Sequence, residues 1–217
     1  MNKTPAILNR PFVPYVLPFL FLLIFIYLAP LVHISKGIIY PIQTLVLAGV
    51  LFYFRHAYLD EIKPFFDLTA ILAGMLVFAI WILPDGYYPL IGSSQFNPYE
   101  YATGGMVMIL IAFRLAGAVL VIPLMEELFW RSFAMRFLIQ DDFKAVPLGQ
   151  FTLKSFLVTA VAFGFEHHHW LPGIIAGMIY AGVLYRTKNL FSPIIAHMVT
   201  NLLLGIYVLM TEQWRFW

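Results

Sequence analysis

The sequence of 217 residues contains no cysteine, and charged residues make up only 11% of it. The lack of cysteine excludes a thiol protease, a disulfide-stabilised scaffold and a metal cluster held by thiolates. A soluble globular domain carries about 25% charged residues, so this chain has too few charges for a surface that faces only water. The net charge of +2 is too small to indicate a nucleic-acid partner.

Hydrophobic residues make up 62% of the chain. Because a helix needs roughly 20 apolar residues to cross a bilayer, the sequence predicts an all-α polytopic transmembrane bundle. We expect seven membrane helices, or eight if the long fourth one splits, in a single integral membrane domain over 1–217. The expected spans are Tyr15–Ile34, Ile38–Phe54, Phe66–Leu83, Gly105–Pro123, Lys154–Phe165, Gly173–Tyr185 and Leu190–Met210. The fourth is expected to continue to Leu138, with a kink at Pro123.

The distribution of Lys and Arg predicts the orientation of the chain. The linker 84–104 has neither residue and is expected outside, while Lys36 and Arg215 are the exceptions on that side. The N-terminal apolar run is too long for a signal peptide and is expected to stay as an anchor helix. With the N-terminus inside, the cytoplasmic segments hold Lys3, Arg10, Arg55, Lys63, Arg136, Lys144, Lys154, Arg186 and Lys188.

Ionisable residues inside membrane helices are costly and indicate function by default. They divide the chain into a hydrophobic frame over 1–104 and helices over 105–210 that carry the polar groups. At about 1.5 Å per residue, Glu127 and His167 each lie roughly 18 Å above the same cytoplasmic turn. His197 lies roughly 12 Å above the next one, so the three side chains are expected at similar depth, nearer the cytoplasm. The polar residues are Arg114, Glu126, Glu127, Arg131, Glu166, His167, His168, His169, His197 and Asn201.

Separations of four residues place side chains on one helix face. Glu127 and Arg131 have this separation and are expected to form an ion pair. His197 and Asn201 repeat it, as do Phe163 and His167. Glu126 and Glu127 point about 100° apart, so only one of them is expected to face a given point squarely.

These residues form three motifs: Glu126-Glu127-Leu-Phe-Trp-Arg131, Phe163-Gly-Phe-Glu-His167 and His197-Met-Val-Thr-Asn201. In this order they resemble the EExxxR, FxxxH and HxxxN motifs of the CAAX prenyl protease and bacteriocin-processing family of intramembrane proteases. The resemblance covers 114–204, and the short chain is similar to the CAAX prenyl protease-related group that accompanies exosortase sorting systems. The family's best-known members remove the last three residues after a prenylated cysteine.

The resemblance implies an endopeptidase of a bacterial inner membrane that cuts near the C-terminus or in a juxtamembrane segment of a protein substrate. By the same resemblance, Glu126 and His167 would activate a water, and His197 and Asn201 would stabilise the oxyanion. Glu127 and Arg131 would orient them, and Phe163 would form part of the pocket wall. The partners implied are a protein or peptide substrate, membrane-anchored or not, and the lipid bilayer, with no nucleic acid.

Several alternatives stay open. Two histidines and a glutamate suit catalytic zinc, whose ligands would be Glu126, His167 and His197, but the chain lacks an HExxH motif and a water without metal is favoured. A shifted register would make His168 the working residue. Ser132 has no evident partner for serine chemistry. The buried charges also suit a structural network with Arg114, or a non-catalytic immunity factor or proton-coupled carrier.

Overall fold

The computed structural model describes residues 10–28, 31, 34–93 and 95–217. Lys3 and part of the first expected span lie outside these residues. Within them the chain is entirely helical and forms seven helical rods, as the sequence predicts. The first three and last three rods are α1 (Val13–Leu28), α2 (Lys36–Phe54), α3 (Leu68–Ile82), α7 (Leu153–Phe165), α8 (Trp170–Thr187) and α9 (Phe191–Thr211).

The fourth rod is one helix over Gly105–Phe137. It comprises α4 (Gly105–Ala116), a π-helical segment (Gly117–Val121), α5 (Ile122–Glu127), a second π-helical segment (Leu128–Ala134) and α6 (Met135–Phe137). The expected continuation to Leu138 is therefore confirmed to within one residue. Eight rods are not formed in the described part of the chain, because this helix does not split.

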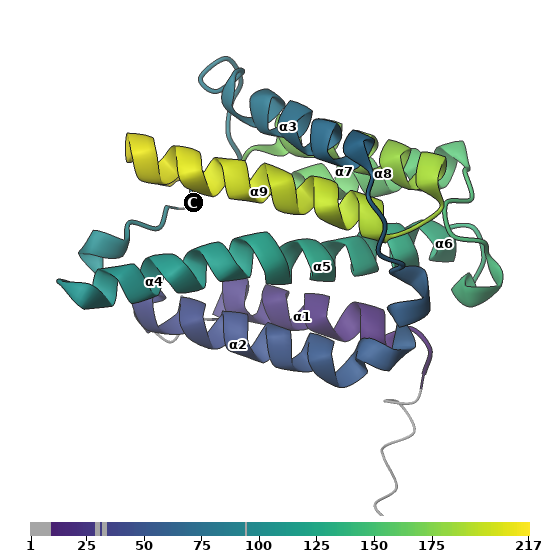
Figure 1. Ribbon diagram of the computed structural model, residues 1–217, viewed down its shortest axis with the longest axis horizontal. Helices are drawn as coiled ribbons and strands as arrows, with labels where there is room; N and C mark the ends of the chain where they lie inside the picture. The colour runs from purple at the N-terminus through teal and green to yellow at the C-terminus, as the bar shows by residue number, and fades with distance from the viewer. Residues whose placement is uncertain (1–9, 29–30, 32–33, 94) are drawn as a thin grey trace, which may run out of the picture.

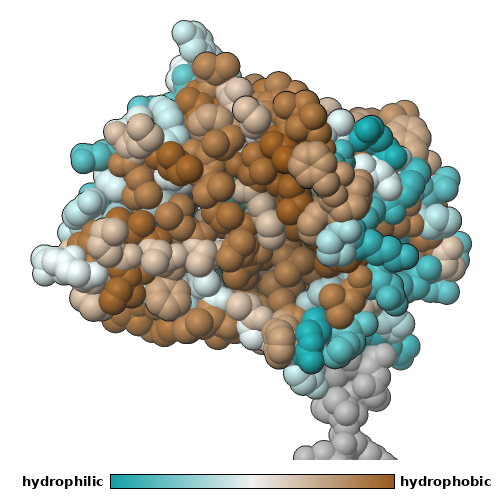
Figure 2. All heavy atoms as spheres, viewed as in Figure 1, coloured by the Kyte–Doolittle hydropathy of each residue, from teal (hydrophilic) through white to brown (hydrophobic). Residues whose placement is uncertain are grey.

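The hydrophobic surface agrees with a membrane protein. Three helices are long and apolar enough to cross a bilayer, namely Lys36–Ala57, Gly105–Phe137 and Phe191–Thr211, and three shorter ones are also apolar. A broad hydrophobic face covers the middle of the molecule, and hydrophilic atoms gather at the end where α6 lies (Figure 2). This distribution is typical of a helical bundle whose middle faces lipid.

The long fourth helix runs through the centre of the bundle (Figure 1). On one side of it lie α1 and α2, and on the other lies α9 with α3 beyond it. The helices α7 and α8 pack against each other, and α8 also contacts α3 and α9. Although α3 belongs to the first hundred residues, it packs with α8 and with α9, which carries the third motif.

Two π-helical segments flank the glutamate pair. The first ends directly before α5, whose second residue is Pro123. Because proline has no N–H for the carbonyl one turn earlier, a local widening of the helix is a common response. The predicted irregularity at Pro123 therefore takes the form of a π segment, and Glu126 and Glu127 occupy one α-helical turn between two such segments.

The turn between α7 and α8 lies against the linker 84–104. Ile91 donates its N–H to the carbonyl of His168 at 3.1 Å. The His168 Nδ1 lies 2.6 Å from the Ile91 carbonyl, and Trp170 Nε1 donates to the Pro89 carbonyl at 2.9 Å. Since α7 has 13 residues and is about 20 Å long, it is shorter than a bilayer core of about 30 Å. If α7 starts at the cytoplasmic face, as the Lys and Arg distribution predicts, the linker must reach into the bundle to contact this turn.

At the opposite end, Glu61 joins three parts of the chain. It lies in the link between α2 and α3 and pairs with Arg136 at 2.9 Å and Lys144 at 2.7 Å. Ser132 also donates to its carboxylate. Burial by itself raises the pKa of Glu61, but the charge of Arg136 and the contacts with Lys144 and Ser132 together lower it below its ordinary value.

Candidate active site

Glu127 is fully buried and binds two partners. Its Oε2 lies 3.1 Å from Nε of Arg131, which confirms the expected pairing along the helix. Its Oε1 lies 3.0 Å from Nδ1 of His197 on α9. Because a carboxylate only accepts, Nδ1 carries the hydrogen and donates it. Glu127 thus fixes the position of both side chains.

Glu126 approaches the other side of the same imidazole. Its Oε2 lies 4.0 Å from Nε2 of His197, and both side chains are buried. This oxygen has no hydrogen-bond partner within the described residues. Although the two glutamates point in different directions from one helix, both therefore converge on His197, one at each ring nitrogen.

Arg131 connects the glutamate helix to α7 and α8. Its guanidinium lies 4.3 Å from the centroid of the Phe163 ring and 5.5 Å from that of Tyr180. It also donates to the carbonyl of Gly177 at 3.3 Å. A buried cation held by a carboxylate and two ring faces is well compensated. Arg131 therefore has the geometry of an orienting group.

His167 packs against Phe163, whose ring also contacts Arg131. Its Nδ1 is 2.8 Å from the Phe163 carbonyl, and its ring lies edge-on to Trp81 of α3 with centroids 5.3 Å apart. The Phe163 ring is 4.9 Å from that of His167 and 6.0 Å from that of His197. In the part of the chain that the structure describes, His167 makes no hydrogen bond to either glutamate.

Asn201 points to the first π segment. Its Nδ2 donates to the Ala118 carbonyl at 2.7 Å. His197 lies one turn earlier on α9 and is held by Glu127 instead. The two side chains share a helix face as expected, but they are fixed by different parts of the central helix.

Comparison with protein families shows what this cluster is similar to. Residues 108–203 match the model of the family described as Type II CAAX prenyl endopeptidase Rce1-like. The segment that carries the three motifs is therefore similar to this family, and we call it the Rce1-like segment. The match spans all three motifs and supports the CAAX prenyl protease family that they resemble. No curated protein and no solved structure matches the chain.

The Rce1-like segment contains two further residues at the site to which sequence reasoning assigned no role. Glu166 is adjacent to His167, and its Oε2 accepts a hydrogen bond from Trp130 at 3.0 Å. Tyr180 of α8 stacks on His197 with centroids 4.9 Å apart and donates to Thr200 at 2.8 Å. The position of Glu166 beside the second motif was a signal, whereas nothing in the sequence marks Tyr180 among the other aromatic residues.

Other polar residues of the Rce1-like segment lie away from Glu126 and Glu127. Arg114 faces aromatic rings, with its guanidinium 4.3 Å from the Tyr40 centroid, and forms no ion pair within the described residues. The charge network with Arg114 is therefore not formed there. Ser132 does have partners, but they are Glu61 and Arg136 rather than a histidine. His168 is exposed and contacts the linker at Ile91.

The set Glu126, His167 and His197 does not fit a metal site. Among the described residues no three histidine or acidic side chains gather closely enough to hold an ion. The Nε2 of His197 is 4.0 Å from Glu126, and His167 uses Nδ1 on a backbone carbonyl. The donor geometry of these three side chains therefore does not suit zinc.

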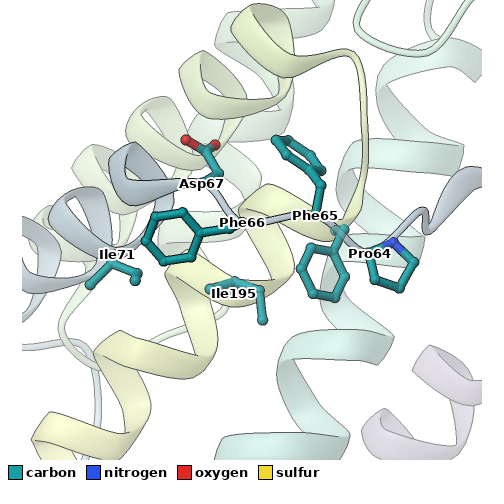
Figure 3. Close-up of a pocket in the computed structure, with 7 residues that line it drawn as sticks. Pro64, Phe65, Phe66, Asp67, Ile71 and Ile195 are labelled. Atoms are coloured by element: carbon teal, nitrogen blue, oxygen red, sulfur yellow. The ribbon is translucent and has the colours of Figure 1, made fainter.

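A surface hollow of about 450 Å³ lies apart from this cluster (Figure 3). The start of α9 and the link into α3 form its walls, and none of the motif residues borders it. In the close-up, the rings of Phe65 and Phe66 border it, and the Asp67 carboxylate points away from them. This hollow has no polar group placed for hydrolysis.

Proposed function

We propose that the protein is an intramembrane endopeptidase that cuts a protein substrate near its C-terminus or in a juxtamembrane segment. The observation that carries the proposal is the buried cluster in which Glu126 and Glu127 meet opposite nitrogens of His197. Such a cluster is energetically costly within a hydrophobic bundle, and buried ionisable groups of this kind indicate a functional site by default. The Rce1-like match over the same residues supports protease chemistry.

In the proposed mechanism, Glu126 accepts a proton from the attacking water while the water oxygen bonds to the scissile carbonyl carbon. His167 completes the wall around this water. The carbonyl oxygen becomes an oxyanion, which His197 and Asn201 stabilise by hydrogen bonding. When the C–N bond breaks, Glu126 returns the proton to the leaving nitrogen, so atoms and charges balance.

Glu127 and Arg131 act by orienting His197. Because Glu127 accepts from Nδ1, its charge favours the imidazolium form of His197. The proposed role requires that form, since only the imidazolium has an Nε2–H to donate to the oxyanion. Arg131 holds the carboxylate in place from the same helix. The rings of Phe163 and Tyr180 close the cluster against lipid.

The proposed substrate is an extended segment, because a helical peptide keeps its carbonyls in internal hydrogen bonds. We place the protein in a bacterial inner membrane as one domain over 1–217, in which 1–104 frame the motif-bearing helices 105–210. The proposed chemistry at the scissile bond is the same for a lipidated and an unlipidated substrate, and for a soluble and a membrane-anchored one.

The test is a comparison of protein termini in the native host. Cells would carry wild-type protein, Glu126→Ala or, as a control, Glu100→Gln, an exposed carboxylate in the linker. All three would be matched for membrane level. We expect new C-termini with wild type and the control that are absent with Glu126→Ala. Two results together would instead support a non-catalytic immunity factor or carrier. The termini would be identical in all three strains, and cells that carry Glu126→Gln would keep the biological function seen with wild type.

A further inference from the structure

Glu166 is a second carboxylate at the site, on a different helix from Glu126. It caps the end of α7, and its Oε2 accepts a hydrogen bond from Trp130 Nε1 at 3.0 Å. Its other oxygen, Oε1, is buried and has no hydrogen-bond partner in the described part of the chain. One oxygen is thus anchored and the other is free to bind a ligand.

The position of Trp130 brings Glu166 to Glu126. Trp130 follows Glu126 by four residues on the same helix, so the two side chains share one helix face. The Glu126 carboxylate interacts electrostatically with Glu166 as well as with Glu127. Like that of Glu166, one of its oxygens is buried and unpaired. Two helices therefore each supply one unpaired carboxylate oxygen, on side chains close enough to interact.

Neither Glu126 nor Glu166 forms an ion pair with Arg131 among the described residues. Arg131 is already bound to Glu127 at 3.1 Å and to the Gly177 carbonyl at 3.3 Å. A buried carboxylate oxygen without a donor is unfavourable in folding, and a bound donor would recover this cost. A water molecule has two O–H donors, which matches two converging acceptors.

We propose that Glu166 is a catalytic residue that holds the attacking water together with Glu126. This proposal rests on the proposed function. The water donates one O–H to Glu126 and the other to Glu166 Oε1, which directs an oxygen lone pair at the scissile carbonyl. On attack, the first proton moves to Glu126 and the new C–O bond forms. The second hydrogen stays on that oxygen, bound to Glu166, and leaves with the product carboxyl group.

A purely structural role for Glu166 makes a different prediction. If Glu166 served only to accept from Trp130, the amide of Glu166→Gln would do the same through its oxygen. That variant replaces the other acceptor oxygen by an N–H₂ donor, which repels the O–H of the water. The substitution therefore removes the proposed contact and keeps the structural one.

The experiment uses full-length protein reconstituted in liposomes and a synthetic peptide that spans the cleavage site mapped in the host. For Glu166→Gln we expect kcat to fall by about 100-fold with KM within about twofold, because the water is no longer oriented. Glu166→Asp, which keeps the carboxylate, should recover part of this loss. Trp130→Phe should lower kcat by about 3- to 10-fold, since Glu166 loses its anchor. Glu100→Gln should match wild type.

Wild-type kcat for Glu166→Gln, with Glu126→Gln inactive, would overturn this proposal and leave the endopeptidase intact. If Glu126→Gln also cleaved at the wild-type rate, the proposed function would fail and this inference with it. Should Glu166→Gln not fold, Trp130→Phe decides, because it leaves both carboxylates in place. A wild-type kcat for Trp130→Phe would overturn the proposal that Glu166, anchored by Trp130, holds the water.

Discussion

At the scale of single residues, Glu127 determines how the cluster is assembled. Its spacing from Arg131 predicted their ion pair, because residues four apart share a helix face. Its contact with His197 spans 70 positions, and no local rule predicts it. Glu166 illustrates the same limit, since its partner Trp130 comes from a different helix. Local spacing thus predicted the pair within one helix but not the contacts between helices.

The buried pair of Glu127 and Arg131 should be strongly coupled energetically. Removing one charge leaves the other buried without compensation, so Glu127→Gln and Arg131→Met should each cost about 3–5 kcal/mol in unfolding free energy. The double variant should cost less than the two single costs added together, by about 0.5–3 kcal/mol. Denaturant unfolding of the detergent-solubilised protein would measure all three.

The partly exposed pair of Asp85 and Arg215, 2.7 Å apart, is a control for this cycle. Half of the Arg215 side chain is accessible, at 54%, so its coupling should be at most about 1 kcal/mol. If the costs of Glu127→Gln and Arg131→Met were additive, with a coupling energy no larger than that of the control pair, this result would contradict a compensated ion pair.

At the scale of elements, the sequence predicted the helices better than their internal irregularities. Hydrophobic length located all seven rods, and the ends of α7 and α9 fall within one residue of expectation. The two π segments were not predicted, because they follow from how the central helix fits its neighbours rather than from a change in hydrophobic pattern. Only Pro123 gave a sign of the first one.

Glycines explain how α7 and α8 approach so closely. A Cβ at Gly164 would lie 2.2 Å from Ile174 Cγ1 and 2.7 Å from the Trp170 carbonyl oxygen. A Cβ at Gly177 would lie 3.0 Å from the Cα of Ala160. Small residues of this kind allow membrane helices to pack with their backbones in contact. The packing matters for the site, because Gly164 lies three residues before His167.

Substitution of these glycines should separate packing from helix propensity. Gly164→Ala should destabilise the protein by about 1–3 kcal/mol, because the new methyl group meets backbone atoms that cannot move freely. Gly182→Ala on α8 has open space around its Cβ and should be neutral or stabilising by up to about 1 kcal/mol. Thermal unfolding in detergent would compare them, and equal stability of both variants would count against close packing of α7 on α8.

At the scale of the whole molecule, the depth of the site follows from helix lengths and from the linker. Counting residues from the cytoplasmic turns predicted a similar depth for Glu127, His167 and His197. The structure adds that the turn after His167 touches the linker 84–104, which is expected outside. The helix α7 is too short to span the bilayer core. A site in the cytoplasmic half can therefore contact the outer linker only if that linker descends into the bundle.

The orientation of the bundle can be tested directly, because the chain has no cysteine of its own. A single cysteine at Tyr87, 89% exposed in the linker, should react with a membrane-impermeant maleimide in intact cells. A cysteine at Asp141, exposed between α6 and α7, should react only after permeabilisation. The physical reason is that Arg136, Lys144 and Lys154 cluster at this second connection, and basic loops stay in the cytoplasm. The reversed labelling pattern would mean that the bundle has the opposite orientation, with the linker on the cytoplasmic side of the membrane.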